Sequence, residues 1–485
     1  MTAVRPPLAD ELFDPGSVAV VGASGNPEKW GYWLAKGALA GRARREVHLV
    51  NRRGGSLDGV PFRAALDGLP CEHVVVAVPP AHVRPVVTEG LAAGARCFTV
   101  ITSGGDPAEE RALAALVTSG GARLLGPNCM GLVDTTTELR LSWGDFPAGA
   151  VGLVSQSGNL ALEIGRHLAR VGEGFSRFVS LGNQRDIDAA DALETLICHP
   201  GTRVIAAYVE DFRDGRRLAR ALTAAHAAGK PVLLLTVGRS AASTGAAASH
   251  TGALVSPYAT VAAVCRDSGA LLLESAGELV DTAMCLLAGR DRGAPGAARG
   301  PASGSAPTAL RIAVVGDSGG QGALAADAFT VRGAEVPALS PETTARLAGL
   351  LPPRAGCRNP VDLAGAGEAD LGVYARVAGE LLASGEADAV VLTGYFGDYA
   401  AANPAQATRE CEVAGLLADA ADTTGRRLVV HTMARGTPAL AVLRGRRIPV
   451  HERIEQAAGL GFTSAALEAT GHDELHARVT RAYEE

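Results

Sequence analysis

Residues 17–31 read SVAVVGASGNPEKWG, and this stretch decides the fold. Its first five residues form a short, mostly apolar run that stops at Gly22, where a turn of small and polar residues begins. From about Gly31 onward the chain has the length and composition of a helix. A buried strand that passes through a glycine turn into a helix is the first unit of a parallel α/β sheet.

The same alternation continues along the chain after this stretch. Four more apolar runs are separated by helix-length segments: 46–51, 73–79, 96–102 and 122–127. Strands that are apolar throughout, rather than alternating, are buried on both faces, which is typical of parallel sheets covered by helices. We therefore expect a doubly wound α/β domain over residues 1–145.

Two further α/β series follow the first. The second has apolar runs at 151–156, 175–182, 204–210, 231–238 and 270–275, with helical intervals such as 214–228. The third has them at 311–316, 388–396 and 427–433, and its first turn, GDSGGQG at 316–322, again joins a strand to a helix. Residues 291–308 are rich in Gly, Pro, Ala and Ser, which predicts a flexible linker. We expect the second and third domains at 146–290 and 309–475.

The composition indicates a globular protein with room for three cores, since 47% of its 485 residues are hydrophobic and 20% are charged. A net charge of −6 gives no support for a nucleic-acid-binding or membrane-binding surface. No stretch approaches the ~18 uninterrupted apolar residues of a membrane span. The eight cysteines are scattered, with no CxxC pair and no histidine at metal-ligand spacing. We therefore expect reduced thiols, no metal site and a cytoplasmic location.

The turn from Gly22 to Pro27 predicts a phosphate-containing ligand, because glycine lets the backbone approach phosphates and a helix N-terminus attracts them. The dinucleotide fingerprint also needs glycine at its third and sixth places, where Ser24 and Pro27 stand. The second strand ends in NRR at 51–53 instead of an acidic residue. This disfavours NAD and favours a phosphorylated ribose, as in coenzyme A or NADP. The alternative is a plain glycine turn followed by two solvated arginines.

Residues 238–254, GRSAASTGAAASHTGAL, place a single histidine, His250, among Gly, Ala, Ser and Thr. Small side chains leave room around the imidazole. The hydroxyls of Ser249 and Thr251 can hydrogen-bond a charged group carried on it, which suits phosphohistidine chemistry. The alternative is a helix N-terminus capped by one of these hydroxyls, with His250 merely exposed.

Eight motifs in the first 290 residues resemble, in the same order, the α-subunit type of the NDP-forming acyl-CoA synthetases, the superfamily of ADP-forming acetyl-CoA synthetase and succinyl-CoA synthetase. They are GASGNPEKWG (22–31), VNRRGG (50–55), AVPP (77–80), GPNCMGL (126–132), VSQSGNLALE (154–163), SLGN (180–183), YVE (208–210) and SHTGAL (249–254). The third series resembles the additional α/β domain of the acetyl-CoA type through SGGQG (318–322) and NPVD (359–362).

This resemblance implies a Rossmann-like coenzyme A-binding domain at 1–145, followed by two flavodoxin-like domains of the succinyl-CoA synthetase type. The first of these, 146–290, would be the phosphohistidine ligase domain, and 309–475 a third, ligase-associated domain.

The resemblance also implies roles for individual residues. His250 would be phosphorylated, with Glu210 fixing its tautomer and stabilising its charge. The alternative for Glu210 is a strand-end acid that faces solvent. The implied phosphate-binding residues are Ser155, Gln156, Ser157 and Gly158, where a plain N-cap by Ser157 is a compatible alternative. Those of the acyl pocket are Gly182, Asn183 and Asn128, and those that bind coenzyme A are Gly22, Ser24, Arg53, Val78, Pro79 and Pro80.

The chain departs from the family pattern at two places in the first domain. Arg52 stands where the family usually has proline. The sequence SGGDP at 103–107 displaces a glutamate that usually follows the fourth strand. These departures leave the contacts to the pantetheine arm open.

The family phosphorylates its histidine from ATP through an ATP-grasp domain, and we find no such domain in this sequence, which has few lysines. We therefore expect an α subunit in a hetero-oligomer with a separate ATP-grasp β subunit, which would bind ATP or ADP and Mg²⁺. Its substrates would be a small carboxylic acid and coenzyme A. Two alternatives stay open: a regulatory or scaffold protein that binds coenzyme A or acyl-CoA without turnover, and an NADP-binding Rossmann reductase, for which Arg52 and Arg53 are the only argument.

Overall fold

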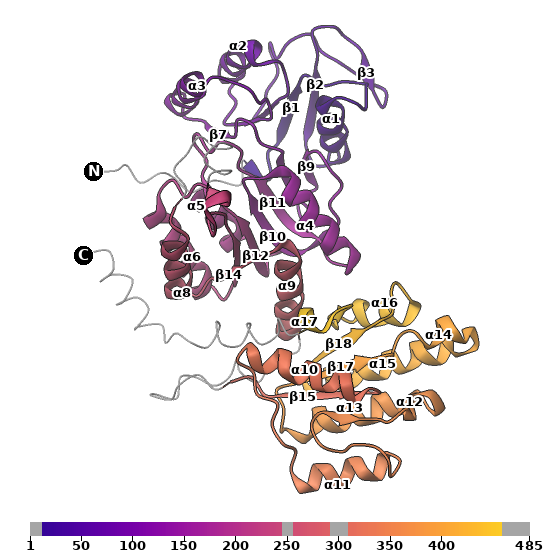
Figure 1. Ribbon diagram of the computed structural model, residues 1–485. Coiled ribbons are helices and arrows are strands. Elements are labelled where there is room, and N and C mark those ends of the chain that lie inside the picture. Colours follow the sequence, from indigo (N-terminus) through magenta and orange to yellow (C-terminus); the bar gives the residue numbers. More distant parts are fainter. Residues whose placement is uncertain (1–11, 245–255, 292–308, 458–485) are drawn as a thin grey trace. The chain divides into compact units, whose positions relative to one another are not determined.

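The computed structural model describes residues 12–244, 256–291 and 309–457 (Figure 1). These residues fall into two compact units, one ending at Ala276 and the other beginning at Gly277. His250 and the predicted linker from residue 292 onward lie outside the described residues. No helix among the described residues is both long and apolar enough to cross a bilayer.

The first sheet is parallel throughout, as its apolar runs predict, and its strand order is β2-β1-β5-β6-β7. The strands are β1 (Ser17–Val21), β2 (Glu46–Val50), β5 (His73–Val76), β6 (Cys97–Val100) and β7 (Arg123–Leu125). The helices are α1 (Trp30–Ala40), α2 (Pro80–Ala92) and α3 (Pro107–Ser119). A short hairpin of β3 (Ser56–Leu57) and β4 (Val60–Pro61) follows β2. The core around the first sheet contains the fully buried side chains of Val20, Leu34 and Val75.

The second sheet has the order β14-β13-β12-β10-β11-β8-β9. Its parallel strands are β10 (Ala148–Ser155), β11 (Phe175–Ser180), β12 (Val204–Tyr208), β13 (Val232–Leu235) and β14 (Leu271–Leu273). The helices are α4 (Gly158–Arg170), α5 (Ala189–Cys198), α6 (Gly215–Ala227) and α8 (Tyr258–Ser268). In Figure 1, α4 lies on one side of these strands and α6 and α8 lie on the other.

One edge of the second sheet differs from the prediction of parallel strands only. Strands β8 (Gly131–Asp134) and β9 (Leu139–Ser142) form a hairpin that pairs antiparallel with β11. The turn between them is short, and the side chain of Asp134 closes it by accepting hydrogen bonds from the N–H groups of Thr136 and Thr137 at 2.9 and 3.1 Å. Antiparallel strands need only such a turn, whereas parallel strands need a long crossover.

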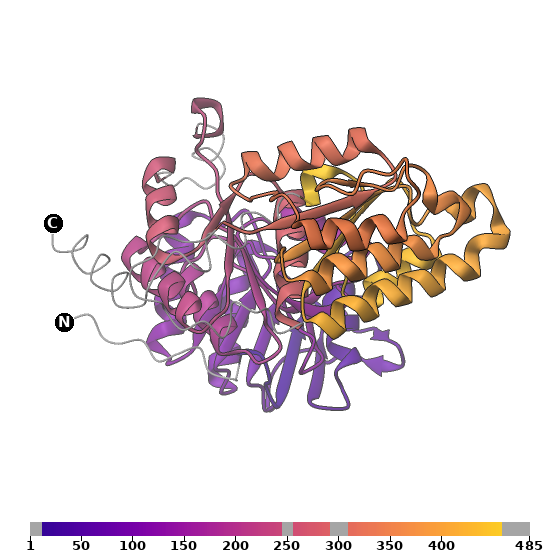
Figure 2. The same ribbon diagram turned by 90° about the horizontal axis from the view of Figure 1, so that it is seen from below.

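The sheet of the second unit is parallel, with the order β16-β15-β17-β18-β19. Its strands are β15 (Ile312–Gly316), β16 (Val361–Asp362), β17 (Ala389–Gly394), β18 (Arg427–Thr432) and β19 (Val450–His451). In sequence order this is the 2-1-3-4-5 arrangement of flavodoxin-like folds, the fold that the family resemblance implies. Figure 2 shows helices on both faces of the sheet.

The longer helices of this unit are α10 (Gly319–Val331), α11 (Pro341–Leu350), α13 (Gly372–Ser384), α15 (Ala407–Thr424) and α16 (Pro438–Gly445). The shorter ones are α12 (Ala366–Ala369), α14 (Tyr399–Ala402) and α17 (Ile454–Ala457). Helix α9 (Ala276–Asp291) belongs to this unit from Gly277 onward, since Cys285 shares a core with Phe329 of α10. The domain boundaries at 145 and 290 remain predictions.

Candidate functional site

Several predicted site residues lie at one edge of the second sheet. Strands β10, β11 and β12 are parallel neighbours, so their carboxyl ends meet at the same edge. Ser155, Ser180 and Tyr208 end these strands, and Glu210 follows Tyr208 by two residues. Ligands of open α/β sheets bind at this edge, where helices begin and strands end.

The turn from β10 into α4 is shaped by its own hydroxyl groups. The Ser155 hydroxyl is fully buried and donates to the carbonyl oxygen of Ser157 at 2.7 Å. The Ser157 hydroxyl accepts a hydrogen bond from the N–H of Leu160 at 3.3 Å and is therefore the N-cap of α4. The first N–H groups of a helix have no partner inside it, so a capped α4 still attracts an anion at its N-terminus. The capping alternative and the phosphate-binding prediction are thus compatible in this geometry.

The side chain of Gln156 turns toward the end of β12. Its Oε1 accepts hydrogen bonds from the N–H groups of Glu210 and Asp211, the second at 2.8 Å. Its own N–H donates to the carbonyl oxygen of Tyr208 at 3.0 Å. Gln156 therefore holds the backbone that carries Glu210.

Glu210 is buried, with 6% of its surface exposed, instead of facing solvent. Its Oε1 accepts a hydrogen bond from the Tyr208 hydroxyl at 2.8 Å. Burial and this carboxylate together raise the pKa of Tyr208 above its ordinary value. His250 lies outside the described residues. In the sequence it comes after β13, which is the parallel neighbour of β12. The Thr236 hydroxyl, just after β13, donates to the carbonyl oxygen of Val209 at 2.7 Å and ties the two strand ends together.

A pocket of about 420 Å³ joins the first sheet to the turn from β10 into α4, residues 155–158, which we call the phosphate turn after its predicted ligand. It brings together five of the predicted site residues: Val78, Asn128, Gln156, Ser157 and Gly158. Other residues in its wall are Trp30, Ala77, Ile101, Thr102, Ser103, Cys129, Met130, Trp143, Asn159 and Ser180. Gly22, Ser24 and Arg53, predicted to contact coenzyme A, do not line it.

The three predicted acyl-pocket residues contact one another. The side-chain amide of Asn128 donates to the side-chain oxygen of Asn183 at 3.2 Å. Gly182 has φ +56°, and a Cβ built there would lie 2.3 Å from the carbonyl oxygen of Pro127. Only glycine allows that approach, so Gly182 sets how closely the β11 turn packs on Asn128.

Sequence reasoning missed Glu110, which lies in the first turn of α3 and binds the side chain of Asn183. Its carboxylate is 6% exposed and accepts hydrogen bonds from the Asn183 amide at 2.9 and 3.0 Å. It also accepts one from Nε of Arg185 at 2.8 Å. The sequence offered one signal for Glu110: the family glutamate is displaced by SGGDP, and Glu110 follows that stretch. However, acidic residues are common in the first turn of any helix, so this signal did not single out Glu110.

In the first domain, the turn after β1 is held closely against β5. Gly22 has φ +95°, and a Cβ there would lie 2.2 Å from the carbonyl oxygen of Ala77. The Ser24 hydroxyl accepts a hydrogen bond from the N–H of Asn26 at 3.0 Å. The Asn51 amide donates to the carbonyl oxygen of Ala23 at 2.7 Å, and its oxygen accepts from the N–H of Arg53 at 2.9 Å.

Of the other predicted coenzyme A contacts, Val78 is half-buried, and Arg53, Pro79 and Pro80 are exposed. The side chain of Arg53 is exposed beside the turn after β1. Exposed Pro79 and Pro80 begin α2, and the carbonyl oxygen of Val78 accepts from the Thr102 hydroxyl at 2.7 Å.

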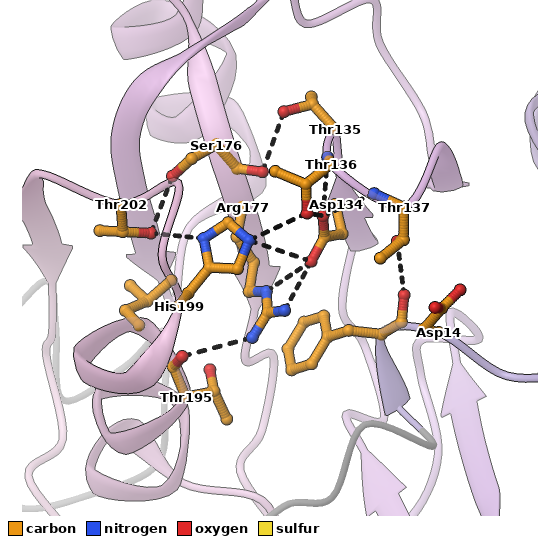
Figure 3. Close-up of polar contacts among 12 residues, drawn as sticks. Asp14, Asp134, Thr135, Thr136, Thr137, Ser176, Arg177, Thr195, His199 and Thr202 are labelled. Atoms are coloured by element: carbon orange, nitrogen blue, oxygen red, sulfur yellow. Dashed lines mark hydrogen bonds and ion pairs between the residues drawn. The ribbon is translucent and has the colours of Figure 1, made fainter.

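A buried polar network fixes the hairpin edge of the second sheet (Figure 3). Nε of Arg177 on β11 donates to Asp134 of β8 at 2.7 Å, and the guanidinium lies 3.7 Å from the centre of the Phe13 ring. His199 contacts Thr202 through Nδ1 at 2.9 Å. Burial and the nearby Arg177 charge lower the pKa of His199 to about 4. Burial alone would raise the pKa of Asp134, but Arg177, the Thr136 hydroxyl and His199 together outweigh it and hold that pKa below its ordinary value.

The second unit has a smaller pocket, of about 310 Å³, at the turn GDSGGQG. Ser318 is the N-cap of α10, since its hydroxyl accepts from the N–H of Gln321 at 3.3 Å. Asp317 accepts hydrogen bonds from the hydroxyls of Tyr374 and Tyr399, the second at 2.7 Å. The described residues contain no cluster of three or more His, Cys, Asp or Glu side chains that could hold a metal ion.

Two family models match the chain. A coenzyme A-binding domain matches residues 16–135, and a succinyl-CoA ligase-like flavodoxin domain matches residues 148–286. The first match favours coenzyme A over NADP as the ligand of the turn after β1.

Relatives match most of the chain. It is 32% identical over 370 residues to the α subunit of ADP-forming acetate–CoA ligase I of Pyrococcus furiosus, covering 73% of this chain and 76% of that subunit. It is 29% identical over 470 residues to the α subunit of ligase II of the same organism, covering 94% and 97%. Among solved structures, an acetyl-coenzyme A synthetase of Ca. Korarchaeum cryptofilum, in complex with phosphate and ADP, has a TM-score of 0.80 at 26% identity, covering 98% of both chains.

The order of the motifs, the two matched domains and the identity across three quarters of a known α subunit agree with one another. The chain belongs to the family of ADP-forming acetate–CoA ligase α subunits.

Proposed function

We propose that this protein is the α subunit of an NDP-forming acyl-CoA synthetase. It interconverts acyl-CoA, phosphate and a nucleoside diphosphate with a carboxylic acid, coenzyme A and the nucleoside triphosphate. The observation that carries this proposal is the 420 Å³ pocket, which is lined both by strand ends of the first sheet and by the N-terminus of α4. A pantetheine arm that enters past Val78 and Thr102 reaches a phosphate at Ser157 within one pocket.

The reaction has three steps in this account. A phosphate oxygen attacks the thioester carbonyl, the C–S bond breaks, and coenzyme A leaves as the thiol after taking a proton. His250 then attacks the phosphorus of the acyl phosphate, and the acid leaves as its carboxylate. Finally, the phosphoryl group passes from His250 to a nucleoside diphosphate. The N-terminus of α4 stabilises the negative charge on phosphorus in the first two steps.

Glu210 serves the histidine in this scheme. A carboxylate that accepts a hydrogen bond from one ring nitrogen fixes the tautomer, so that the other nitrogen can attack phosphorus. The burial of Glu210 supports this role, because a carboxylate removed from solvent interacts more strongly with a developing imidazolium charge. Ser155 and Gln156 act by holding the phosphate turn and the end of β12, respectively.

Coenzyme A would lie along the carboxyl ends of the first sheet. Gly22 and Ser24 shape the turn toward its phosphates, and exposed Arg53 pairs with the ribose phosphate. Val78, Pro79 and Pro80 form the turn beside it, while Asn128, Gly182 and Asn183 close the site at the acyl end.

The nucleotide and Mg²⁺ would bind to an ATP-grasp β subunit, so that the working enzyme is a hetero-oligomer. The names of the two Pyrococcus furiosus relatives, both α subunits, support such a partner. In this scheme the phosphoryl group of His250 passes to the nucleotide on the partner subunit. A cytoplasmic location fits the eight cysteines, all of which are free thiols.

Thioester formation tests this function. The chain is assayed with ATP, Mg²⁺, coenzyme A and a panel of short and aromatic acids, first alone and then with a candidate ATP-grasp subunit. We expect the chain alone to be inert and the pair to form thioester, with Glu210→Gln about 10²- to 10⁴-fold slower. Ligation by the homogeneous chain alone contradicts the need for a partner. Failure of the pair to form acyl-CoA from any acid, or acyl phosphate from any acyl-CoA, contradicts the ligase function.

A further inference from the structure

Two of the three tryptophans of the chain, Trp30 and Trp143, line the 420 Å³ pocket. Trp30 begins α1, and Trp143 follows β9, yet their ring centres are 5.6 Å apart with planes tilted by 49°. Trp33 lies nearly one helical turn after Trp30 and does not line the pocket. Trp30 is 44% exposed. Two indoles in contact at a pocket wall, one of them well exposed, present a large apolar surface that a ligand can cover.

The composition of the pocket shows which end of the substrate these indoles face. The pocket contains the phosphate turn, with Gln156 and Ser157, but none of Gly22, Ser24 and Arg53. On the proposed function, the reacting carbonyl lies at the phosphate turn and the adenosine lies at Arg53. The indoles are therefore at the thiol and acyl end of the substrate.

The chemistry of the wall indicates the kind of acyl group. Val78, Ile101 and Met130 are the other large apolar residues of the wall. A sulfur and two indoles favour contact with the face or edge of another aromatic ring. The indoles, rather than the volume, select the acyl group: the pocket of about 420 Å³ also holds the phosphate and the end of the pantetheine arm, and an acetyl group would leave the indoles in water.

We propose that Trp30 and Trp143 form the acyl-binding wall of this pocket and that the acid handled by this protein carries a planar aromatic ring. This inference rests on the proposed function, and it goes further in assigning the substrate class and the two residues that select it. The indoles make no contact with the reacting atoms, so they bind the acyl group without taking part in the chemistry.

Calorimetric titration of the full chain with free coenzyme A, acetyl-CoA and benzoyl-CoA tests this proposal. We expect benzoyl-CoA to bind about 3- to 10-fold more tightly than acetyl-CoA, the range for contact with one or two aromatic rings. Trp30→Ala and Trp143→Ala should abolish this difference and leave the affinity for free coenzyme A unchanged. Trp33→Ala is the matched control, because it removes an indole on the same helix that lies outside the pocket wall, and it should keep the difference.

The outcomes separate this inference from the function on which it rests. If coenzyme A binds but the two thioesters bind equally, the aromatic acyl class is wrong and the ligase proposal stands. If the tryptophan variants lower the affinity for free coenzyme A as much as the affinity for benzoyl-CoA, the indoles contact coenzyme A itself. That result also overturns the inference. If no form of coenzyme A binds, the proposed function fails. Circular dichroism checks folding, and Trp30→Ala alone decides the matter if Trp143→Ala does not fold, since Trp30 is the more accessible helix-end residue.

Discussion

The side-chain amide of Asn128 donates a hydrogen bond to that of Asn183 at 3.2 Å, linking the segment after β7 of the first sheet to the turn after β11 of the second. Asn183 in turn donates to Glu110, which also binds Arg185. The position of Asn128 in the pocket wall therefore depends on a buried carboxylate that the pocket does not contain. On the proposed function, this arrangement makes Glu110 a positioning residue for the acyl end of the site.

Glu110→Ala should destabilise the protein, because it leaves Arg185 and the Asn183 amide without their buried acceptor. We expect the free energy of unfolding to fall by about 2–4 kcal/mol in urea titration. Glu110→Gln keeps one acceptor oxygen for Asn183 and should be milder. In the reconstituted enzyme, KM for the acid should rise more than KM for coenzyme A. Equal stability of Glu110→Ala and wild type would show that this network holds nothing in place.

Gly22→Ala should lower the free energy of unfolding much more than Gly94→Ala does. Both glycines have similar positive φ angles, +95° and +89°, but a Cβ at Gly22 would lie 2.2 Å from the carbonyl oxygen of Ala77 and one at Gly94 meets nothing within 4 Å. Gly94→Ala therefore measures the backbone strain alone, about 1–2 kcal/mol. Gly22→Ala should cost more than this in thermal or urea unfolding and also weaken coenzyme A binding. Similar losses in both variants would mean that β5 does not constrain the turn.

Arg53 should account for selectivity toward the ribose phosphate of coenzyme A. Calorimetry should show that wild-type protein binds coenzyme A more tightly than 3′-dephospho-coenzyme A by about 1–3 kcal/mol. Arg53→Ala should bind both with the lower affinity, and NADPH should not bind. A phosphate preference that survives in Arg53→Ala would assign the contact to another residue.

Acid should lower the free energy of unfolding because of the buried histidines. His73 is fully buried, and burial lowers its pKa from 6.5 to about 3. The unfolded chain therefore takes up a proton below pH 6.5 that the folded protein does not, so stability falls as pH falls. The slope is up to about 1.4 kcal/mol per pH unit for this residue, and it extends down to its folded pKa. Urea unfolding at pH 7.0, 6.0 and 5.0 should show this loss, with a shallower slope in His73→Asn. An identical slope in that variant would assign the loss to other groups, such as His199.

The apolar runs of the sequence predicted the parallel strands well, because a strand buried on both faces has to be apolar along its length. They did not predict the β8–β9 hairpin. Its segment, GLVDTTTELRLS at 131–142, contains charged and hydroxyl side chains whose burial depends on Arg177, far away in the sequence. The sequence also did not predict that α9 packs in the core of the second unit. The apolar residues of a helix do not indicate which of two neighbouring sheets they pack against.

The candidate site was predictable only where a motif is local. The turns at Gly22 and Ser155 are continuous in sequence, so their shape can be inferred from glycine and hydroxyl positions. The contacts of Glu110 with Asn183 and of Trp30 with Trp143 join segments that are about 70 and 110 residues apart in the sequence. A single sequence carries no signal for such pairs, because each residue also has an ordinary role where it stands. His250 lies outside the described residues, and its role rests on the family resemblance and the surrounding small residues.

Phosphorylation of His250 is the central claim of this account, and labelling tests it most directly. The full chain is incubated with radiolabelled phosphate and an acyl-CoA, and the bound label is assayed for acid and base stability. We predict one acid-labile, base-stable phosphoryl group that disappears in His250→Asn and persists in His167→Asn, a control on α4 outside the pocket wall. Label that persists unchanged in His250→Asn would contradict the phosphohistidine mechanism.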